Sequence, residues 1–377
     1  MADTKLAIIG CGLIGGSMAL ALRRRRPEWR IACLDLADRL PALREAGVAD
    51  EIGTLDDMAA CLPECSIVIL AMPVPSILEM VERIGPHLRL GAIVTDVGST
   101  KKRIMAEAQK LMPPGTHFVG GHPIAGSERS GVEAADPLLF SDRVYVLCPY
   151  PDTPPDALLA LLDLVESLMA RPITIDPEEH DRIMAMVSHL PQLIAVALMH
   201  AAQAADATHT MLEAIAGRGF LDMTRLAASD YGVWKGILET NRDAILEAIA
   251  RFEKSLSLLS DAVSGGNAAL VWEQASRRRR HMGSENLNRL RKIDLRVMID
   301  HYDRQLLGIL GHRMQAARKV GKLKMNQATP VHDPDRERRM LGQRGEWGKS
   351  WGLSRDLIDE LFAVILRHSN RIQETES

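Results

Sequence analysis

Hydrophobic positions divide the chain into a first part with short apolar runs and a second part with helical spacing. Up to about residue 176, runs of aliphatic residues alternate with stretches of helical periodicity, which is typical of βαβ units and a mostly parallel sheet. From about residue 178 onward, helical patterns dominate. The sequence therefore predicts an α/β domain followed by all-α regions. The expected strands are Leu6–Ile9, Arg30–Asp35, Ile67–Ala71, Ala92–Asp96, His117–Val119, Val144–Leu147 and Pro172–Ile175.

The helical part is interrupted twice. Gly265-Gly266-Asn267 breaks the pattern, and His281-Met282-Gly283-Ser284 resembles a linker. A second helical block runs from Leu287 to about Lys324, and as one helix it would measure roughly 55 Å. A helix of that length cannot bury its apolar stripe within so small a domain, so we expect a partner chain to cover it. The stripe consists of Leu295, Ile299, Tyr302, Leu306 and Leu310.

The bulk composition is typical of a globular protein, with 46% apolar and 25% charged residues among 377. The net charge of −3 and the aromatic content of 4% argue against a nucleic-acid partner. Two arginine runs, Arg23–Arg26 and Arg277–Arg280, are interpreted as solvated helix ends, where cations complement the helix dipole.

The five cysteines do not form a disulfide framework. Cys61 and Cys65 lack the second ligand pair of a metal site, so no metal is expected. The sequence enters a strand directly without a signal peptide. We expect no apolar run of membrane-spanning length, no membrane partner, and a location in the reducing cytoplasm.

A glycine-rich turn follows the first predicted strand and precedes a helix. Gly10, Gly12 and Gly15 have the G-x-G-x-x-G spacing: the first permits a tight turn, the second lets backbone approach a pyrophosphate, and the third allows close packing. Asp35 ends the next strand, where a carboxylate accepts hydrogen bonds from ribose hydroxyls and repels a 2′-phosphate. The pattern predicts NAD rather than NADP, although Arg39 weakens that preference. The expected cofactor-binding residues are Gly10, Gly12, Leu13, Ile14, Gly15 and Asp35.

Later segments carry polar groups that a scaffold alone does not require. Together with the glycine-rich turn, they resemble the prephenate/arogenate dehydrogenase family over about residues 5–282. The resemblance implies NAD-dependent oxidation and decarboxylation of prephenate, or of its amino-acid analogue arogenate, without a metal. The segments are Asp96-Val97-Gly98-Ser99-Thr100-Lys101, Gly120-Gly121-His122-Pro123-Ile124-Ala125-Gly126, Ser188-His189-Leu190-Pro191 and Gly217-Arg218-Gly219-Phe220-Leu221-Asp222-Met223-Thr224-Arg225.

The resemblance assigns roles to individual residues. His122 would accept the proton of the ring hydroxyl, with Ser99 beside it, and imidazole suits this task because its ordinary pKa lies near neutrality. Arg225 would hold the ring carboxylate in its planar guanidinium fork. Each assignment has an alternative, because His122 before Pro123 can cap a turn and Arg225 can form a surface ion pair.

Two further residues are expected on the substrate side. His189 is assigned to substrate binding, and its alternative is a hydrogen bond at a helix start or between domains. Gln192 departs from the family, since many prephenate-preferring members have a histidine there. Glutamine keeps hydrogen bonding but cannot carry a charge, which leaves the choice between prephenate and arogenate open.

From about Leu287 to Gln373 the chain resembles the all-helical class of chorismate mutases. This module has eighteen Lys and Arg against twelve Asp and Glu, which favours a dianionic substrate. The rearrangement is unimolecular and needs no acid or base, so the protein folds the substrate and stabilises its polarised transition state. The resemblance is carried by Leu295, Arg296, Asp300, Asp303, Leu306, Leu307, Arg313, Lys324, Pro330, Val331, Asp333, Arg336, Glu337, Ser369 and Gln373.

Arg296 and Arg313 lie seventeen positions apart on one predicted helix, which is about 25 Å. One chain cannot place both on one small ligand, so Arg296 is expected to come from a partner subunit. The alternative of solvated helix charges suits Arg304, Lys319 and Lys322 better. By resemblance, Arg313 and Arg296 bind the two carboxylates, Lys324 and Gln373 the ether oxygen, and Glu337 and Asp333 the ring hydroxyl, with Arg336 and Ser369 completing the pocket.

The two halves together imply a fused enzyme of tyrosine biosynthesis. The C-terminal module would convert chorismate to prephenate, and the N-terminal part would oxidise prephenate with NAD to 4-hydroxyphenylpyruvate, in a homodimer. One alternative is a dehydrogenase that uses arogenate, or both compounds, with a non-catalytic chorismate-binding or dimerising module. Another is a generic hydroxy-acid dehydrogenase with a regulatory tail.

Four segments are expected along the chain. Residues 1–176 form an α/β Rossmann-type nucleotide-binding domain. Residues 177–282 form an all-α substrate and dimerisation domain. Residues 283–286 are a linker, and residues 287–377 form an all-α chorismate mutase domain.

Overall fold

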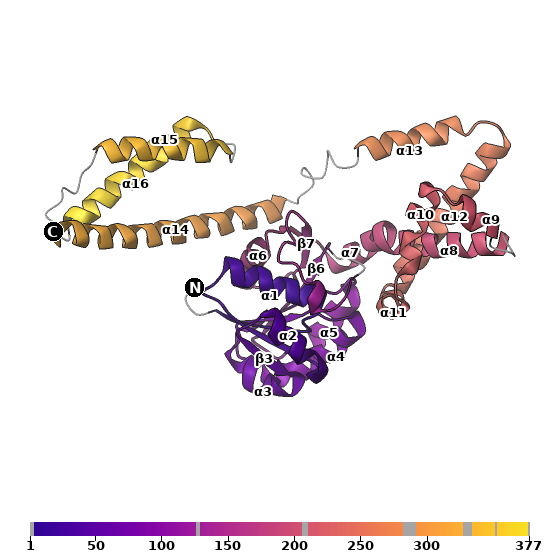
Figure 1. Ribbon diagram of the computed structural model, residues 1–377, viewed down its shortest axis with the longest axis horizontal. Coiled ribbons are helices and arrows are strands. Elements are labelled where there is room, and N and C mark those ends of the chain that lie inside the picture. Colours follow the sequence, from indigo (N-terminus) through magenta and orange to yellow (C-terminus); the bar gives the residue numbers. More distant parts are fainter. Residues whose placement is uncertain are drawn as a thin grey trace. The chain divides into compact units, whose positions relative to one another are not determined.

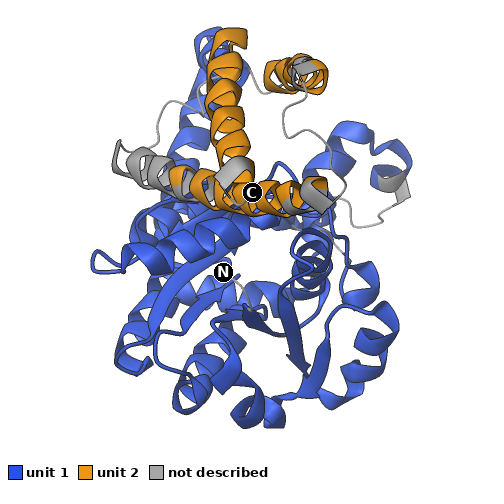
Figure 2. Cartoon of the chain, turned by 90° about the vertical axis from the view of Figure 1, so that its left-hand side faces the viewer, with its two compact units in different colours: residues 1–294 blue, residues 295–377 orange. Residues whose placement is uncertain are grey.

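The computed structural model describes residues 4–125, 129–205, 210–281, 292–326, 334–350 and 353–375. The chain forms two compact units, residues 1–294 and 295–377, which are coloured separately in Figure 2. In the described part of the chain, the first unit contains a sheet with its covering helices and a helical region. The second contains helices only (Figure 1).

An eight-stranded sheet, as far as the described residues show, forms the centre of the first unit in the order β3-β2-β1-β4-β5-β6-β7-β8. Neighbouring strands are parallel except β6 and β7, which are antiparallel. The order from β3 to β6 is that of a dinucleotide-binding sheet, so the predicted α/β fold is confirmed. The strands are β1 (Lys5–Ile9), β2 (Arg30–Asp35), β3 (Glu51–Thr54), β4 (Ile67–Leu70), β5 (Ile93–Asp96), β6 (His117–Pro123), β7 (Val144–Cys148) and β8 (Arg171–Thr174).

Helices cover both faces of this sheet, so its strands are apolar along their whole length. Leu6, Ala7, Ile8 and Ile9 of β1 are all fully buried. The covering helices contribute one apolar face each; in α4 the buried residues recur at helical spacing, as Val74, Ile77, Val81 and Ile84. The helices are α1 (Leu13–Arg25), α2 (Leu40–Ala46), α3 (Met58–Cys61), α4 (Val74–Ile84), α5 (Lys102–Leu111) and α6 (Pro155–Ser167).

The helical region of the first unit has only a small core of its own. Ala185, Leu190, Ile237, Ile245 and Ala248 are buried there. Many large apolar side chains are exposed in the single chain, among them Met199, Val233, Leu246 and Trp272. The region consists of α7 (Pro177–Met184), a π-helical turn (Ala185–His189), α8 (Leu190–Ala205), α9 (Thr210–Ile215), α10 (Arg218–Thr224), the short helix η7 (Arg225–Ala228), α11 (Tyr231–Thr240), α12 (Arg242–Ser264) and α13 (Ala269–His281).

One helical stretch in this region corrects a sequence expectation. Pro177–Ala204 is 28 residues long with a hydropathy of 1.5 over its most apolar window, which by length and composition is enough to cross a membrane. The expectation that no apolar run reaches that length was therefore wrong. Only 28% of that window is buried in the single chain. The stretch also carries the buried polar residues His180, Asp181, His189 and Gln192.

Two details of the sheet differ from the sequence prediction. Strand β3 was not predicted, because Glu51-Ile52-Gly53-Thr54 has a single aliphatic residue and no alternation. Strand β6 was predicted to end at Val119, yet it continues to Pro123 because β7 pairs with its second half. The extension places His122 inside the strand.

The second unit contains the long helix α14 (Lys292–Asn326), followed by α15 (Pro334–Ser350) and α16 (Arg355–Thr375). Helix α14 has 35 residues and is thus roughly 52 Å long, as the pattern predicted. Leu306, Leu307 and Ile309 on it are exposed in the single chain. The predicted linker at residues 283–286 lies outside the described residues.

Candidate active sites

The glycine-rich turn joins β1 to α1 and has the geometry that its spacing predicts. Gly10 has a φ of +88°, and a Cβ there would lie 2.7 Å from the carbonyl oxygen of Ala71. A Cβ on Gly15 would lie 2.2 Å from the carbonyl oxygen of Gly10, whereas one on Gly12 would meet no atom within 4 Å. Glycine is therefore required at the first and third positions, and the second leaves space for a pyrophosphate.

Asp35 is the last residue of β2 and lies beside this turn. Its Oδ2 accepts the N–H of Cys11 at 2.7 Å, and its Oδ1 accepts the N–H of Leu36 at 2.8 Å. The first turn of α1 has no acidic residue, and Gly12 provides no side-chain cap. The turn therefore suits an anion, and the remaining lone pairs of Asp35 suit ribose hydroxyls. These residues fit a dinucleotide.

His122 is the next-to-last residue of β6 and pairs with Val146 of β7, so it does not cap a turn. A fully buried ion pair fixes the backbone before it. Lys101 donates from Nζ to Asp96 and to the carbonyl oxygen of Gly121, the latter at 2.7 Å. Asp96 Oδ1 in turn accepts the N–H of Gly121 at 3.1 Å. His122 therefore stands on a fixed strand at the carboxyl edge of the sheet, the edge that also carries the glycine-rich turn.

The imidazole of His122 is bonded on one side to a second histidine. Its Nδ1 lies 2.9 Å from Nε2 of His180, and His180 Nδ1 lies 2.8 Å from Oδ1 of Asp181. Burial is the main cause that lowers the pKa of His122 well below its ordinary value, with His180, Lys101 and His189 adding to it. The ring is therefore neutral near pH 7 and can accept a proton.

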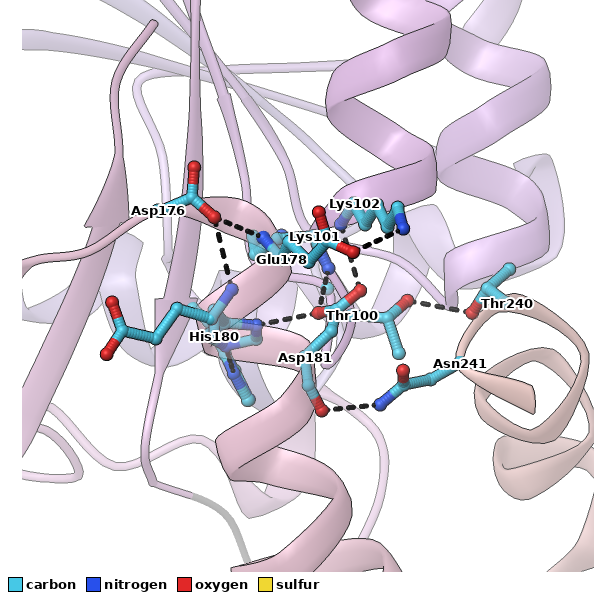
Figure 3. Close-up of polar contacts among 12 residues, drawn as sticks. Thr100, Lys101, Lys102, Asp176, Glu178, His180, Asp181, Thr240 and Asn241 are labelled. Atoms are coloured by element: carbon cyan, nitrogen blue, oxygen red, sulfur yellow. Dashed lines mark hydrogen bonds and ion pairs between the residues drawn. The ribbon is translucent and has the colours of Figure 1, made fainter. Parts of the chain in front are cut away.

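The same cluster joins the sheet to the helical region, as Figure 3 shows. Asp181 accepts the backbone N–H groups of Lys101 at 2.6 Å and Lys102 at 2.9 Å. Its carbonyl oxygen accepts from Asn241 Nδ2 at 2.8 Å. Thr100 and Thr240 share a hydrogen bond of 2.8 Å, and Lys102 pairs with Glu178. These contacts hold α7 and the end of α11 against the start of α5.

His189 is the last residue of the π-helical turn, a type of irregularity found at many functional sites. Its Nδ1 lies 3.2 Å from Nδ2 of Asn241. Because Nδ2 can only donate, His189 Nδ1 must accept and its Nε2 must carry the hydrogen. Within the described part of the chain, this buried Nε2 has no hydrogen-bond partner. His189 thus offers a hydrogen-bond donor at Nε2. Its bond to Asn241 also supports the alternative role, a hydrogen bond at a helix start or between domains.

Burial makes His189 a source of acid sensitivity. Burial is the largest cause lowering the pKa of His189 from 6.5 to about 4. Between those values the unfolded chain binds a proton that the folded chain does not, so stability is complete above pH 6.5 and falls as the pH drops toward 4. The loss is on the order of 3 kcal/mol. Scanning calorimetry should show a falling Tm over that range and a weaker fall for His189→Gln; the exposed His200→Gln serves as the control. An unchanged slope in His189→Gln would refute this account.

Three other predicted residues lie on the loop after β5, on α8 and on η7. Ser99 is half-buried three residues after the end of β5, the strand that pairs with β6. Gln192 is buried, and its Nε2 donates to the carbonyl oxygen of Leu226 at 2.8 Å. Arg225, one residue earlier, is exposed on η7, which packs against α8. Gln192 therefore fixes the backbone that carries Arg225, while Arg225 itself stays outside the buried cluster of this chain.

In the second unit, helices α14, α15 and α16 enclose a cavity of about 220 Å³. Arg313 donates to the hydroxyl of Ser369, and burial together with the neighbouring Arg344 lowers the pKa of its guanidinium. The apolar part of the lining consists of Ala316, Ala317, Val320, Met340 and Leu366. The cavity thus has both cationic and apolar side chains in its lining, which suits a compact dianion. Predicted residues that line it are Arg313, Lys324, Arg336, Ser369 and Gln373.

Three predicted residues cannot be placed in this cavity. Asp333 lies outside the described residues, and Arg296 and Glu337 are described only as residues of α14 and α15. Arg296 stands seventeen positions from Arg313 on the one helix, so the distance argument for a partner's arginine persists.

Sequence reasoning missed several residues of both sites. His180 and Asp181 were not singled out, because Pro177-Glu178-Glu179-His180-Asp181 reads as the acidic first turn of a helix. Asn241 was missed as well, since a lone asparagine between helices is an ordinary helix boundary. Asn370 lines the cavity of the second unit, and its position next to Ser369 was the available signal.

Three models of known protein families match successive parts of the chain. Residues 18–174 match the model described as prephenate dehydrogenase, nucleotide-binding domain, and residues 176–274 match prephenate dehydrogenase, dimerization domain. Residues 295–374 match chorismate mutase type II.

Individual relatives agree with these matches. Prephenate dehydrogenase of Bacillus subtilis is 37% identical over 252 residues, which cover 66% of this chain and 66% of the relative, about two thirds of each. The bifunctional chorismate mutase/prephenate dehydratase of Escherichia coli is 38% identical over 80 residues, 21% of each chain. The crystal structure of prephenate dehydrogenase from A. aeolicus with hydroxyphenyl propionate and NAD+ has a TM-score of 0.70 at 29% identity, covering 75% of this chain and 99% of that one.

Proposed function

Because the chain belongs to the prephenate dehydrogenase family and ends in a type II chorismate mutase domain, we propose that it catalyses two consecutive steps of tyrosine biosynthesis. The C-terminal domain rearranges chorismate to prephenate. The N-terminal domains decarboxylate prephenate oxidatively to 4-hydroxyphenylpyruvate with NAD. The observation that carries the second step is the buried imidazole of His122, bonded through Nδ1 to His180, at the carboxyl edge of the nucleotide-binding sheet.

The dehydrogenase residues divide the work around the ring alcohol. When bound, NAD would supply the acceptor for the hydride that leaves the carbon bearing the hydroxyl. His122 Nε2 accepts the proton of that hydroxyl, and Ser99 orients it. The carboxylate of the resulting dienone then leaves as carbon dioxide, because its departure makes the ring aromatic. NAD is held by Gly10, Gly12, Leu13, Ile14, Gly15 and Asp35.

Substrate binding falls to residues of the helical region. Arg225 binds the ring carboxylate through two parallel hydrogen bonds. His189 donates from its buried Nε2, which lacks a partner in the described part of the chain. Gln192 fixes the backbone that carries Arg225 and faces the side chain that distinguishes prephenate from arogenate. Supply of prephenate by the same chain favours prephenate, and arogenate is the alternative.

The mutase residues act without proton transfer. Arg313, with Arg296 from the partner subunit, binds the two carboxylates and holds the side chain over the ring. Lys324 and Gln373 donate to the ether oxygen, which gains negative charge as its bond to carbon breaks. The cavity that gathers Arg313, Lys324 and Gln373 in one chain supports this assignment. Glu337 and Asp333 bind the ring hydroxyl, and Arg336 and Ser369 complete the pocket.

The assembly we propose is a homodimer in the cytoplasm. The matched dimerization domain and the exposed apolar residues of the helical region support the dimer. All five cysteines are free thiols, which supports a reducing compartment. We divide the chain into a nucleotide-binding domain (1–176), a dimerisation domain (177–282), a linker (283–286) and a mutase domain (287–377).

Cofactor choice tests the dehydrogenase half directly. Asp35→Asn keeps an oxygen for the N–H of Cys11 but removes the charge that binds ribose hydroxyls and repels a 2′-phosphate. The KM for NAD should rise about 10- to 100-fold, and the preference for NAD over NADP should shrink similarly. Initial rates with prephenate and each cofactor measure this, and Asp38→Asn, which removes an exposed charge nearby, is the control. Unchanged cofactor preference in Asp35→Asn would remove Asp35 from the site.

A further inference from the structure

Three buried side chains form a continuous hydrogen-bonded line that ends at His122. His122 Nδ1 lies 2.9 Å from His180 Nε2, and His180 Nδ1 lies 2.8 Å from Asp181 Oδ1. The exposed fractions are 7%, 2% and 2%. The line crosses from β6 to α7, and Figure 3 shows its inner end, where Asp181 faces the start of α5.

The inner end of the line fixes the direction of every hydrogen bond in it. Both oxygens of Asp181 accept backbone N–H groups, Oδ1 from Lys101 and Oδ2 from Lys102. An ionised carboxylate has no hydrogen to donate, so His180 Nδ1 must donate to it. In a neutral His180 ring the other nitrogen, Nε2, then accepts, and His122 Nδ1 must carry a hydrogen. Nε2 of His122 is left with its lone pair.

We infer that His180 and Asp181 are positioning residues that hold His122 as the Nδ1–H tautomer and share the positive charge that His122 gains in the reaction. The inference rests on the proposed dehydrogenase function. The O–H bond of the substrate breaks and an Nε2–H bond forms on His122. The Nδ1 hydrogen then shifts toward His180 Nε2 while the His180 Nδ1 hydrogen shifts toward Asp181. The line thus gains one proton, at His122 Nε2. That proton returns to the phenolate oxygen that forms when carbon dioxide leaves and the ring becomes aromatic, so no further reactant is needed.

The charged neighbours of His122 explain why such sharing matters. Burial is the largest cause that disfavours a positive charge on the ring by lowering its pKa, and the charges of His180, Lys101 and His189 add to it. Asp96 is bonded to Lys101, so its charge is already matched. Among the described residues, the carboxylate of Asp181 accepts from two backbone amides and from His180 Nδ1. It is therefore the anion that can stabilise an imidazolium at His122.

A purely structural role is the competing interpretation, because Asp181 also joins α7 to α5. The tautomer of His122 and the kcat of His180 variants distinguish the two roles. His180→Gln keeps an acceptor oxygen for His122 Nδ1–H but cannot pass a proton to Asp181, whereas His180→Leu removes the acceptor. A structural role predicts equal effects of both on folding and substrate binding. A positioning role predicts a graded loss of kcat with little change in KM.

The first measurement is the ¹⁵N resonance pattern of the His122 ring in the full-length protein without ligands. At pH 7 the wild type should show a protonated Nδ1 and an unprotonated Nε2, and His180→Gln should retain this pattern. His180→Leu should shift toward the Nε2–H form. A wild-type ring with Nε2 protonated would overturn the inference, and this result needs no variant to fold.

The second measurement is prephenate-dependent kcat over a pH series. His180→Leu should lose about 10³- to 10⁴-fold, as a wrong tautomer does in a catalytic triad, and His180→Gln should lose about 10-fold. His117→Leu, at the opposite end of β6, is the matched control. A His180→Leu variant within threefold of the wild type would refute the positioning role. If the wild type itself does not turn over prephenate, the proposed function fails while the tautomer result still stands.

Discussion

His122→Asn is expected to lower kcat for prephenate oxidation by about 10²- to 10⁴-fold, because it removes the group that accepts the hydroxyl proton. The asparagine side chain is close in shape to the Nδ1 side of the imidazole ring, and its amide can still bond to His180. Dinucleotide binding, measured by fluorescence titration of NADH, should not change, since the glycine-rich turn and Asp35 do not contact this side chain in the described structure.

Two controls accompany this experiment. His117→Asn changes the other histidine of β6, which lies at the opposite edge of the sheet, and it should keep wild-type turnover. Chorismate disappearance should also be unchanged in His122→Asn, because that reaction belongs to the other unit. Turnover of His122→Asn within a factor of ten of the wild type would exclude His122 as the base.

Lys324→Ala is expected to lower the rate of chorismate rearrangement by at least about 10²- to 10³-fold. Lys324 lines the cavity of the second unit and is proposed to donate to the ether oxygen as negative charge develops there. Removing one such donor typically has an effect of this size. Chorismate disappearance, followed by its ultraviolet absorbance, measures the rate.

The control for this prediction lies on the same helix. Lys319→Ala removes an equal charge from an exposed position of α14 and should leave the rearrangement intact. In Lys324→Ala, NADH production from supplied prephenate should persist, since the dehydrogenase site contains no residue of the second unit in our account. Loss of both activities would show that the two sites are not separate, and retention of both would exclude Lys324 from the rearrangement.

The sequence was sufficient where a pattern is local. The glycine spacing and the apolar runs of the sheet each lie within a few adjacent residues, and the structure has a strand, a turn and a helix at the first and strands at the others. Strand β3 was invisible because its pairing with β2, rather than its own four residues, makes it a strand. The same holds for the end of β6, which exists because β7 pairs with it.

The residues that sequence reasoning missed are those whose meaning depends on distant contacts. His180 lies 58 positions from His122, and only the packing of α7 on the sheet brings their nitrogens to 2.9 Å. Sequence reasoning also overlooked the length of the apolar stretch Pro177–Ala204. Only 28% of its most apolar window is buried in the single chain. In both cases the deciding partner is not adjacent in sequence.

The most direct test of two activities on one chain is NADH formation with purified protein, NAD and chorismate as the sole substrate. NADH absorbance should rise steadily, because prephenate made by the second unit becomes the substrate of the first. Turnover of added prephenate without turnover of chorismate would contradict the mutase assignment. Silence with both compounds, followed by turnover of arogenate, would contradict the prephenate assignment and point to Gln192.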